Sequence, residues 1–142
     1  MIKDVYLGEE ITITTKNKVG ILADIARALA DEDINIEASV GYEVGDAATL
    51  MLVTNANLRI IDSLKKKGYT SVKENEILVV ELENKPGALK VVTTELANKG
   101  IDIKYSYVTT CASGCMSRMV IQTSDNEEAM VSLKKYTDQD LQ

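Results

Sequence analysis

The sequence contains no histidine, no tryptophan and no phenylalanine, and it has one proline and two cysteines. Histidine is the commonest general base near neutral pH and the commonest metal ligand, so its absence argues against an enzyme or a metalloprotein. No nucleophile has an evident base beside it, and no pair of carboxylates is placed for acid–base chemistry. We therefore expect a non-enzymatic protein with no catalytic residue, no cofactor and no metal.

Long apolar runs are also missing. No segment is long and apolar enough to span a bilayer, and the first residues mix polar and apolar side chains, unlike a signal peptide. These features predict a cytoplasmic protein that does not contact a membrane.

Positive charge is scarce, because 16 lysines and arginines face 22 acidic residues, for a net charge of −6. Divided after residue 75, the two halves each carry a charge of −3. Binding to a phosphate backbone needs clustered basic residues, so we expect no nucleic-acid partner. The run Lys65-Lys66-Lys67 ends a predicted helix, where cations interact favourably with the helix dipole.

What the sequence does contain is an internal repeat. Residues 17–36 and 84–103 align without gaps and are identical at 8 of 20 positions. A repeat of this length indicates two copies of one small domain. We place the first copy, with an N-terminal strand extension, at residues 1–75 and the second copy at residues 76–142.

Each copy has the same predicted order of strands and helices. In the first copy a β-branched strand at residues 10–15 leads through a turn into a helix with apolar residues at helical spacing, marked by Ile21, Leu22, Ile25, Ala26 and Leu29. Two strands at 34–42 and 48–54, a helix marked by Leu58, Ile61 and Leu64, and a short strand at 69–73 follow. The order strand, helix, strand, strand, helix, strand is that of a ferredoxin-like fold.

The second copy repeats this order but ends differently. Its predicted strands are 77–83, 101–110 and 116–123, and Asp125 with Glu128 resembles a capping box for the last helix. The tail after Tyr136 is a poor strand, so this copy lacks its own fourth strand. Ile2, Val5 and Leu7 precede the first copy, and we expect this N-terminal segment to add to a sheet beside the second copy; the alternative is a frayed terminus.

One mismatch between the copies concerns backbone conformation. Gly100 follows a predicted helix, at the position where a left-handed residue is common, and its counterpart is Asp33. If both helices end alike, Asp33 has a positive φ, at a cost of about 1 kcal/mol.

The segments Asn17-Lys18-Val19-Gly20-Ile21-Leu22 and Asn84-Lys85-Pro86-Gly87-Ala88-Leu89, each between a strand and an amphipathic helix, closely resemble the first turn of the ACT domain family. The resemblance extends over residues 9–136, and Pro86 fits the family pattern better than Val19 does. It implies an α+β protein of two ferredoxin-like βαββαβ domains in tandem, with antiparallel sheets and helices on one face. It also implies sensing of a small ligand, usually an amino acid, at an interface between two ACT domains.

The ligand-binding residues that this resemblance implies are the twelve of these two segments: Asn17, Lys18, Val19, Gly20, Ile21, Leu22, Asn84, Lys85, Pro86, Gly87, Ala88 and Leu89. Glycine lets the backbone approach a ligand closely, and a helix N-terminus favours a carboxylate. Asparagine offers both donors and acceptors, which suits a zwitterion. The alternative is that glycine and asparagine serve only the geometry of the turn.

Two further groups stay open. Cys111 and Cys115 flank a predicted hairpin tip, where a disulfide, a shared metal or redox role, or ordinary reduced thiols all fit. Tyr105 and Tyr107 share one face of a strand, packed against a helix or a ligand.

These observations predict a non-catalytic regulatory protein that binds an amino acid, forms a homodimer and acts on a partner such as a metabolic enzyme. The alternative is a ligand-free structural or regulatory subunit that binds a partner enzyme through a sheet edge.

Overall fold

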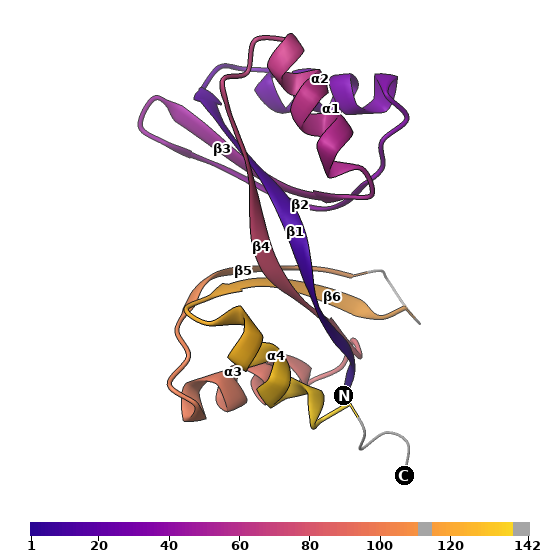
Figure 1. The fold of residues 1–142 in the computed structure, drawn as a ribbon, viewed down its shortest axis with the longest axis vertical. Coiled ribbons are helices and arrows are strands. Elements are labelled where there is room, and N and C mark those ends of the chain that lie inside the picture. The colour runs from indigo at the N-terminus through magenta and orange to yellow at the C-terminus, as the bar shows by residue number, and fades with distance from the viewer. Residues whose placement is uncertain (111–114, 138–142) are drawn as a thin grey trace. The chain divides into compact units, whose positions relative to one another are not determined.

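A computed structural model describes residues 1–110 and 115–137 (Figure 1). The chain divides into two compact units. We call Glu9–Asn75 the first domain, and Met1–Gly8 together with Glu76–Gln142 the second domain. This division differs from the one expected from the repeat in residues 1–8, because these residues belong to a strand next to β4 in the second domain.

The first domain has the element order that the repeat predicts. Its elements are β1 (Ile2–Lys16, from Glu9 onward), α1 (Ile21–Asp31), β2 (Ile36–Val44), β3 (Ala47–Thr54), α2 (Asn57–Lys66) and β4 (Ser71–Leu82, as far as Asn75). The strands are arranged in the order β2-β3-β1-β4. β1 and β2 both run antiparallel to β3, with Ile13 opposite Leu50 and Val40 opposite Met51.

The second domain has the same strand arrangement with a different chain order. Its elements are β4 from Glu76, α3 (Ala88–Asn98), β5 (Ile103–Thr109), β6 (Ser117–Thr123), α4 (Asn126–Lys134) and β1 as far as Gly8. The sheet order is β5-β6-β4-β1, so the N-terminal segment holds the place that β4 holds in the first domain. The expectation that this segment adds to the sheet of the second copy is confirmed.

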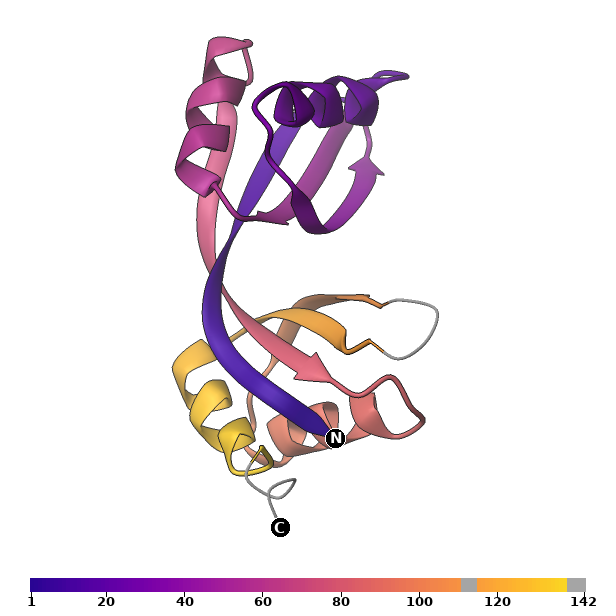
Figure 2. The same ribbon diagram turned by 90° about the vertical axis from the view of Figure 1, so that its right-hand side faces the viewer.

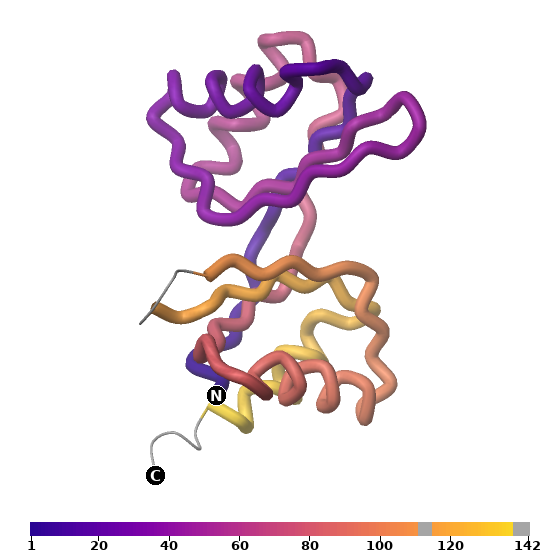
Figure 3. The backbone as a smooth tube through the Cα atoms, turned by 180° about the vertical axis from the view of Figure 1, so that it is seen from behind, coloured from indigo at the N-terminus to yellow at the C-terminus, as the bar shows by residue number. Residues whose placement is uncertain are grey.

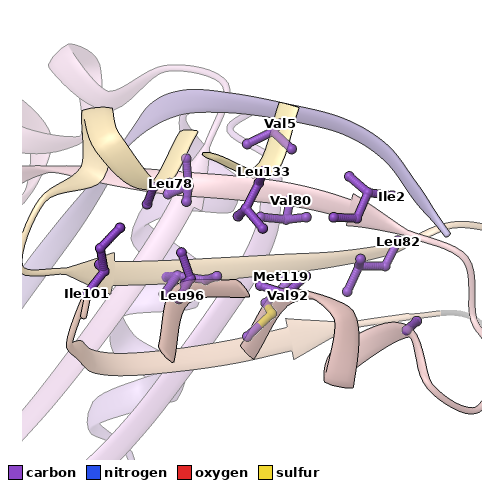
Figure 4. Packing of buried hydrophobic residues seen from close by; sticks show 13 residues of the cluster. Ile2, Val5, Leu78, Val80, Leu82, Val92, Leu96, Ile101, Met119 and Leu133 are labelled. Atoms are coloured by element: carbon purple, nitrogen blue, oxygen red, sulfur yellow. The ribbon is translucent and has the colours of Figure 1, made fainter. Parts of the chain in front are cut away.

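Both helices of each domain cover one face of its sheet, and each core lies between these two layers (Figure 2). In the first domain Ile13, Ile25, Leu29, Leu52 and Leu64 are fully buried in one cluster. In the second domain Ile2 and Val5 of β1 are each 1% exposed and belong to the same cluster as Val80 of β4 and Leu133 of α4 (Figure 4). The N-terminal strand therefore contributes apolar side chains as well as backbone pairing.

The long strands β1 and β4 differ from the shorter strands that the sequence predicts. The polar stretch between Lys73 and Glu76 suggests a break between two strands, yet β4 runs through it. The side-chain amide of Asn75 donates to Thr12 Oγ1 at 2.8 Å. A hydrogen bond between polar side chains on the neighbouring strands β4 and β1 therefore stabilises the pairing in a stretch that has no buried apolar residue.

The apolar faces of two helices also differ in detail. Leu58 is 80% exposed and Leu22 is 54% exposed, so neither is a core residue. The buried face of α2 contains Ile60 and Leu64, and the buried face of α1 contains Ala28 but not the predicted Leu22. The spacing of apolar residues identifies the core-facing side of each helix. It does not decide whether a residue at the border of that side is buried, because successive side chains are rotated by 100° around the helix.

The two equivalent helices α1 and α3 end in the same way. Asp33 has φ 57° and Gly100 has φ 70°. After α1 the amides of Asp33 and Ile34 donate to the carbonyls of Ala30 and Leu29, each at 3.0 Å, which is a Schellman motif. The predicted left-handed Asp33 is confirmed.

Candidate functional site

A left-handed glycine opens each of the two helices that follow a repeat turn. Gly20 precedes α1 with φ 91°, and Gly87 precedes α3 with φ 91°. A side chain at this φ is strained, so glycine suits this backbone better than any other residue. The tight bend that the sequence predicts from the repeated glycine is therefore present in both copies.

The first turns of α1 and α3 have no side-chain cap. In contrast, the carboxylate of Asp125 accepts a hydrogen bond from the amide of Glu128 at 3.0 Å and caps α4, as the capping-box pattern predicts. α2 also starts without a side-chain cap, at Ala56, but there no left-handed glycine opens the backbone. The first N–H of each helix, that of Ile21 or Ala88, donates to the carbonyl of Lys18 or Lys85, so the N–H groups that follow it and the positive end of the helix dipole can meet an anion.

Partners from its own domain surround the first turn. The backbone amide of Asn17 donates to the carbonyl of Asp46 at 2.7 Å, and its side-chain amide donates to the carboxylate of Glu43. The turn thus lies against the tip of the β2–β3 hairpin (Figure 3). Lys18 Nζ lies 3.4 Å from Asp24 Oδ2, so this lysine interacts with the helix rather than remaining free.

The second turn has a different set of partners. The carboxylate of Glu83 lies 2.9 Å from Lys85 Nζ and 3.3 Å from the amino group of Met1. The hydrogen bond from Lys85 and the contact with the amino group lower the pKa of Glu83. The amide of Glu83 donates to the carbonyl of Met1 at 2.9 Å, and a Cβ placed on Gly87 would lie 3.5 Å from Met1 Cε. The start of β1 therefore lies at this turn.

The predicted site residues separate into two groups by burial. Ile21 and Ala88 are 9% and 5% exposed and belong to the two domain cores. Asn17 is half-buried, whereas the exposed residues at the turns are Lys18, Val19, Gly20, Leu22, Asn84, Lys85, Pro86, Gly87 and Leu89. Exposed apolar side chains beside the helix starts are those of Val19 and Leu22 in the first domain and of Leu89 in the second.

Two shallow cavities are lined by described residues. One, of about 410 Å³, lies at the loop end of the β5–β6 hairpin beside Glu81 and Arg118, and the other, of about 360 Å³, lies along α2. Neither is lined by a residue of the two turns. The two turns therefore line neither of these two cavities.

Glu43, Glu83 and Met1 are turn contacts that sequence reasoning missed. Glu83 directly precedes the second motif, so its position in the sequence could have predicted a contact with that turn. Glu43 lies 26 residues beyond Asn17, and only the pairing of β2 with β3 brings it to the turn. Met1 reaches the second turn because β1 completes that sheet.

The other candidate residues give less information. Cys111 lies outside the described residues, so its relation to Cys115 stays a prediction. Tyr105 and Tyr107 are half-buried on β5, and a ligand contact by either also stays a prediction. Within residues 1–110 and 115–137, no group of three or more histidine, cysteine or acidic side chains is placed to hold a metal ion. No helix in those ranges has the length and hydropathy to cross a bilayer.

Family comparison assigns each copy. Residues 10–66 match the family model described as ACT domain, and residues 78–138 match the one described as AHAS small subunit-like ACT domain. A search of curated proteins gives no match.

Solved structures give the same result for the fold. Protein BT0572 from Bacteroides thetaiotaomicron is 26% identical with a TM-score of 0.84, over 93% of this chain and 90% of that one. The regulatory subunit of aspartate kinase from Thermus thermophilus is 15% identical with a TM-score of 0.65, over 94% and 97%. The two family matches together cover most of the chain, one on each copy of the repeat, and the chain therefore belongs to the ACT family as a tandem pair of ACT domains.

Proposed function

We propose that this protein is a non-catalytic regulator that binds a free amino acid at the turns Asn17–Leu22 and Asn84–Leu89. The observation that carries the proposal is the pair of left-handed glycines, each opening a helix whose first turn lacks a side-chain cap. A carboxylate placed there meets N–H groups that no side chain of the helix occupies. The ACT family and the regulatory subunits with a similar fold support the same role.

The ammonium group of an amino acid also needs a partner. At the first turn the carboxylate of Glu43 is held beside Asn17, and at the second turn the carboxylate of Glu83 is next to Asn84. Each turn therefore combines positive helix-terminal N–H groups with a negative side chain, which complements a zwitterion. The glutamate at each turn already has a partner in the chain, so ligand binding replaces or shares an existing interaction.

The side chain of the ligand would lie against exposed apolar surface. Leu22 and Leu89 are 54% and 50% exposed, and they occupy equivalent positions after the two glycines. An apolar amino acid would cover part of these side chains, at about 25 cal/mol per Å² of apolar surface removed from water. We therefore propose a small apolar amino acid as the ligand.

Regulation requires that the ligand favours one state of the protein over another. The shift in that equilibrium is limited to the difference in ligand affinity between the two states. We propose that binding at the turns changes the affinity of a homodimer for a partner such as a metabolic enzyme. The regulatory subunit of aspartate kinase from Thermus thermophilus, which has a similar fold, is an example of a subunit that regulates an enzyme.

A thermal-shift screen of the twenty amino acids tests the proposal, because a ligand that binds the native state raises its melting temperature. Gly20→Val and Gly87→Val place a branched side chain on a turn and are expected to abolish the ligand-induced shift. Gly68→Val is the matched control, because Gly68 has φ 98° and open space around it but follows α2, away from both turns. It should lower the baseline melting temperature and keep the ligand-induced shift.

Equal loss of the ligand response in the Gly68 variant would show that backbone strain, rather than blockage of a turn, removes binding. No shift with any of the twenty amino acids in the unmodified protein would contradict the proposal.

A second candidate function is a ligand-free subunit that binds a partner enzyme through a sheet edge. β2 and β5 lie at the ends of the strand order, and each pairs with one strand only among the described residues. Such edges can pair with another chain. A protein that is silent toward all twenty amino acids but forms a stable complex with an enzyme would favour this candidate.

A further inference from the structure

The helix pair of the second domain contains a buried carboxylate, whereas the helix pair α1 and α2 of the first domain has no buried acidic residue. Glu95, on α3, is 5% exposed. Its carboxylate accepts hydrogen bonds from Ser132 Oγ at 2.5 Å and from Tyr136 Oη at 2.8 Å, and Lys135 Nζ lies 2.8 Å away. These donors lower the pKa of Glu95 to about 2, so the group is an anion at neutral pH. Ser132 of α4, with Lys135 and Tyr136 just after this helix, thus forms a small oxyanion site that the protein's own carboxylate occupies.

The repeat identifies the corresponding residues of the first domain. Ala28 is the eighth residue of α1, as Glu95 is of α3, so the first domain has no carboxylate there. Ser63 is the seventh residue of α2, as Ser132 is of α4. By the same count Lys66 corresponds to Lys135. The first domain therefore has the equivalent serine and lysine, Ser63 and Lys66, but no carboxylate equivalent to Glu95.

A cavity of about 360 Å³ lies at these residues in the first domain. The residues that line it are Glu32, Arg59, Asp62, Ser63, Lys66 and Lys67. Ser63 is 8% exposed, and its hydroxyl has no hydrogen-bond partner among the described residues. Ser63 Oγ is not among the fully buried polar atoms that lack a partner, so this oxygen remains accessible and can donate to a group bound in the cavity.

The residues that line the cavity carry more positive than negative charge, which favours a bound anion, although two of them are acidic. Three cationic side chains line it against two carboxylates, and no ion pair joins any of these five in the described parts of the chain. The guanidinium of Arg59 donates to the carbonyl of Glu32, which holds α2 against the end of α1. Lys66 and Lys67 therefore keep their donors available, while Asp62 would repel an anion.

We propose that this cavity is a binding site for a small oxyanion, a carboxylate or a phosphate group, held by Ser63, Lys66 and Lys67. The bound group takes the part that Glu95 plays in the second domain. The site is separate from the turn Asn17–Leu22, because none of the turn residues lines the cavity.

The test is a titration of the full chain with inorganic phosphate and, separately, with acetate, followed by the amide chemical shifts of α2. Ionic strength is held constant with sodium chloride, because salt screens exposed charges. We expect saturable shifts at Ser63, Lys66 and Lys67. Saturation by acetate alone assigns a carboxylate site, saturation by phosphate alone assigns a phosphate site, and both outcomes support the proposal.

Charge variants separate this site from general attraction to lysine. Lys66→Gln removes one charged donor and should weaken binding about tenfold, which is equivalent to about 1.4 kcal/mol. Lys65→Gln is the matched control, since Lys65 is the adjacent lysine on α2 and does not line the cavity. Asp62→Asn removes a repelling carboxylate and should strengthen binding.

Ala28→Glu provides the reciprocal test. A carboxylate at position 28 imitates Glu95 and should occupy the site, so that titration with either anion no longer shifts the amides of α2. If this variant does not fold, the comparison of Lys65→Gln with Lys66→Gln still tests whether the anion binds in the cavity. Absence of saturable shifts with both anions, or equal weakening by Lys65→Gln and Lys66→Gln, would overturn the proposal.

Discussion

At the residue scale, the clearest feature is that one backbone conformation is served by two different residues. Asp33 and Gly100 both follow a helix with a positive φ and make equivalent hydrogen bonds. Aspartate adopts this conformation at a cost of roughly 1 kcal/mol, which glycine avoids. Among the residues that the structure describes, Asp33 of the first domain is the one non-glycine residue with a positive φ, and its counterpart in the second domain is a glycine.

We expect Asp33→Gly to raise the free energy of unfolding by about 1 kcal/mol, because the strain at Asp33 is removed. The reciprocal change, Gly100→Asp, should lower it by a similar amount. Urea unfolding of both variants measures these changes. Destabilisation by Asp33→Gly would contradict this account and would mean that the aspartate side chain stabilises the native state in another way.

The backbone conformation of Asp33 could be predicted from the sequence, whereas the side-chain contacts of the first turn could not. The repeat predicted the conformation of Asp33 from its alignment with Gly100, because a conformational requirement is preserved when two copies end alike. The contact of Glu43 with Asn17 could not be found in this way, because it depends on how two strands pair. The twelve turn residues stay predicted ligand contacts, and the structure adds that two of them, Ile21 and Ala88, belong to the cores.

At the element scale, the pair α3 and α4 is joined by a buried charge. Glu95 has its pKa lowered to about 2, chiefly by the hydrogen bonds from Lys135, Ser132 and Tyr136. Its ordinary value is 4.5, so the carboxylate loses protons more readily in the folded state than in the unfolded state. The stability that it contributes is present above pH 4.5 and is lost as the pH falls toward 2.

We therefore expect Glu95→Gln to lower the free energy of unfolding by about 2 kcal/mol at pH 7, because charged hydrogen bonds contribute roughly this much. The variant should also show a weaker loss of stability between pH 5 and pH 2 than the unmodified protein. Urea unfolding at a series of pH values measures both effects. Glu74→Gln, at an exposed position on β4, is the control and should change neither.

An unchanged pH profile in Glu95→Gln would mean that other carboxylates cause the acid sensitivity. Sequence reasoning placed the helices correctly but did not predict this network, because Glu95 on α3 is far along the chain from its partners at the end of α4 and just after it.

At the scale of the whole molecule, the second domain is completed from the other end of the chain. Ile2 and Val5 are each 1% exposed in the core of the second domain. The short tail after Tyr136 predicted a missing strand, and the apolar residues at the start of the chain predicted its source. That β1 and β4 are long unbroken strands was not predicted, because the polar residues near Asn75 resemble a loop when the paired strand is not known.

We expect Ile2→Ala to destabilise the second domain by about 2–5 kcal/mol, the usual cost of truncating a buried isoleucine. Amide hydrogen exchange measures the effect locally, and protection should fall in α3 and α4. Lys3→Ala, at the exposed neighbouring position, is the control and should leave exchange unchanged. A loss of protection confined to α1 and α2 would contradict the assignment of residues 1–8 to the second domain.

The central functional claim is that an amino acid binds at the two glycine turns, and calorimetry with each of the twenty free amino acids tests it most directly. We predict saturable heat with at least one apolar amino acid, and loss of that heat in a variant carrying both Gly20→Val and Gly87→Val but not in Gly68→Val. Absence of heat from all twenty, or heat that persists when both turns are blocked, would contradict the account.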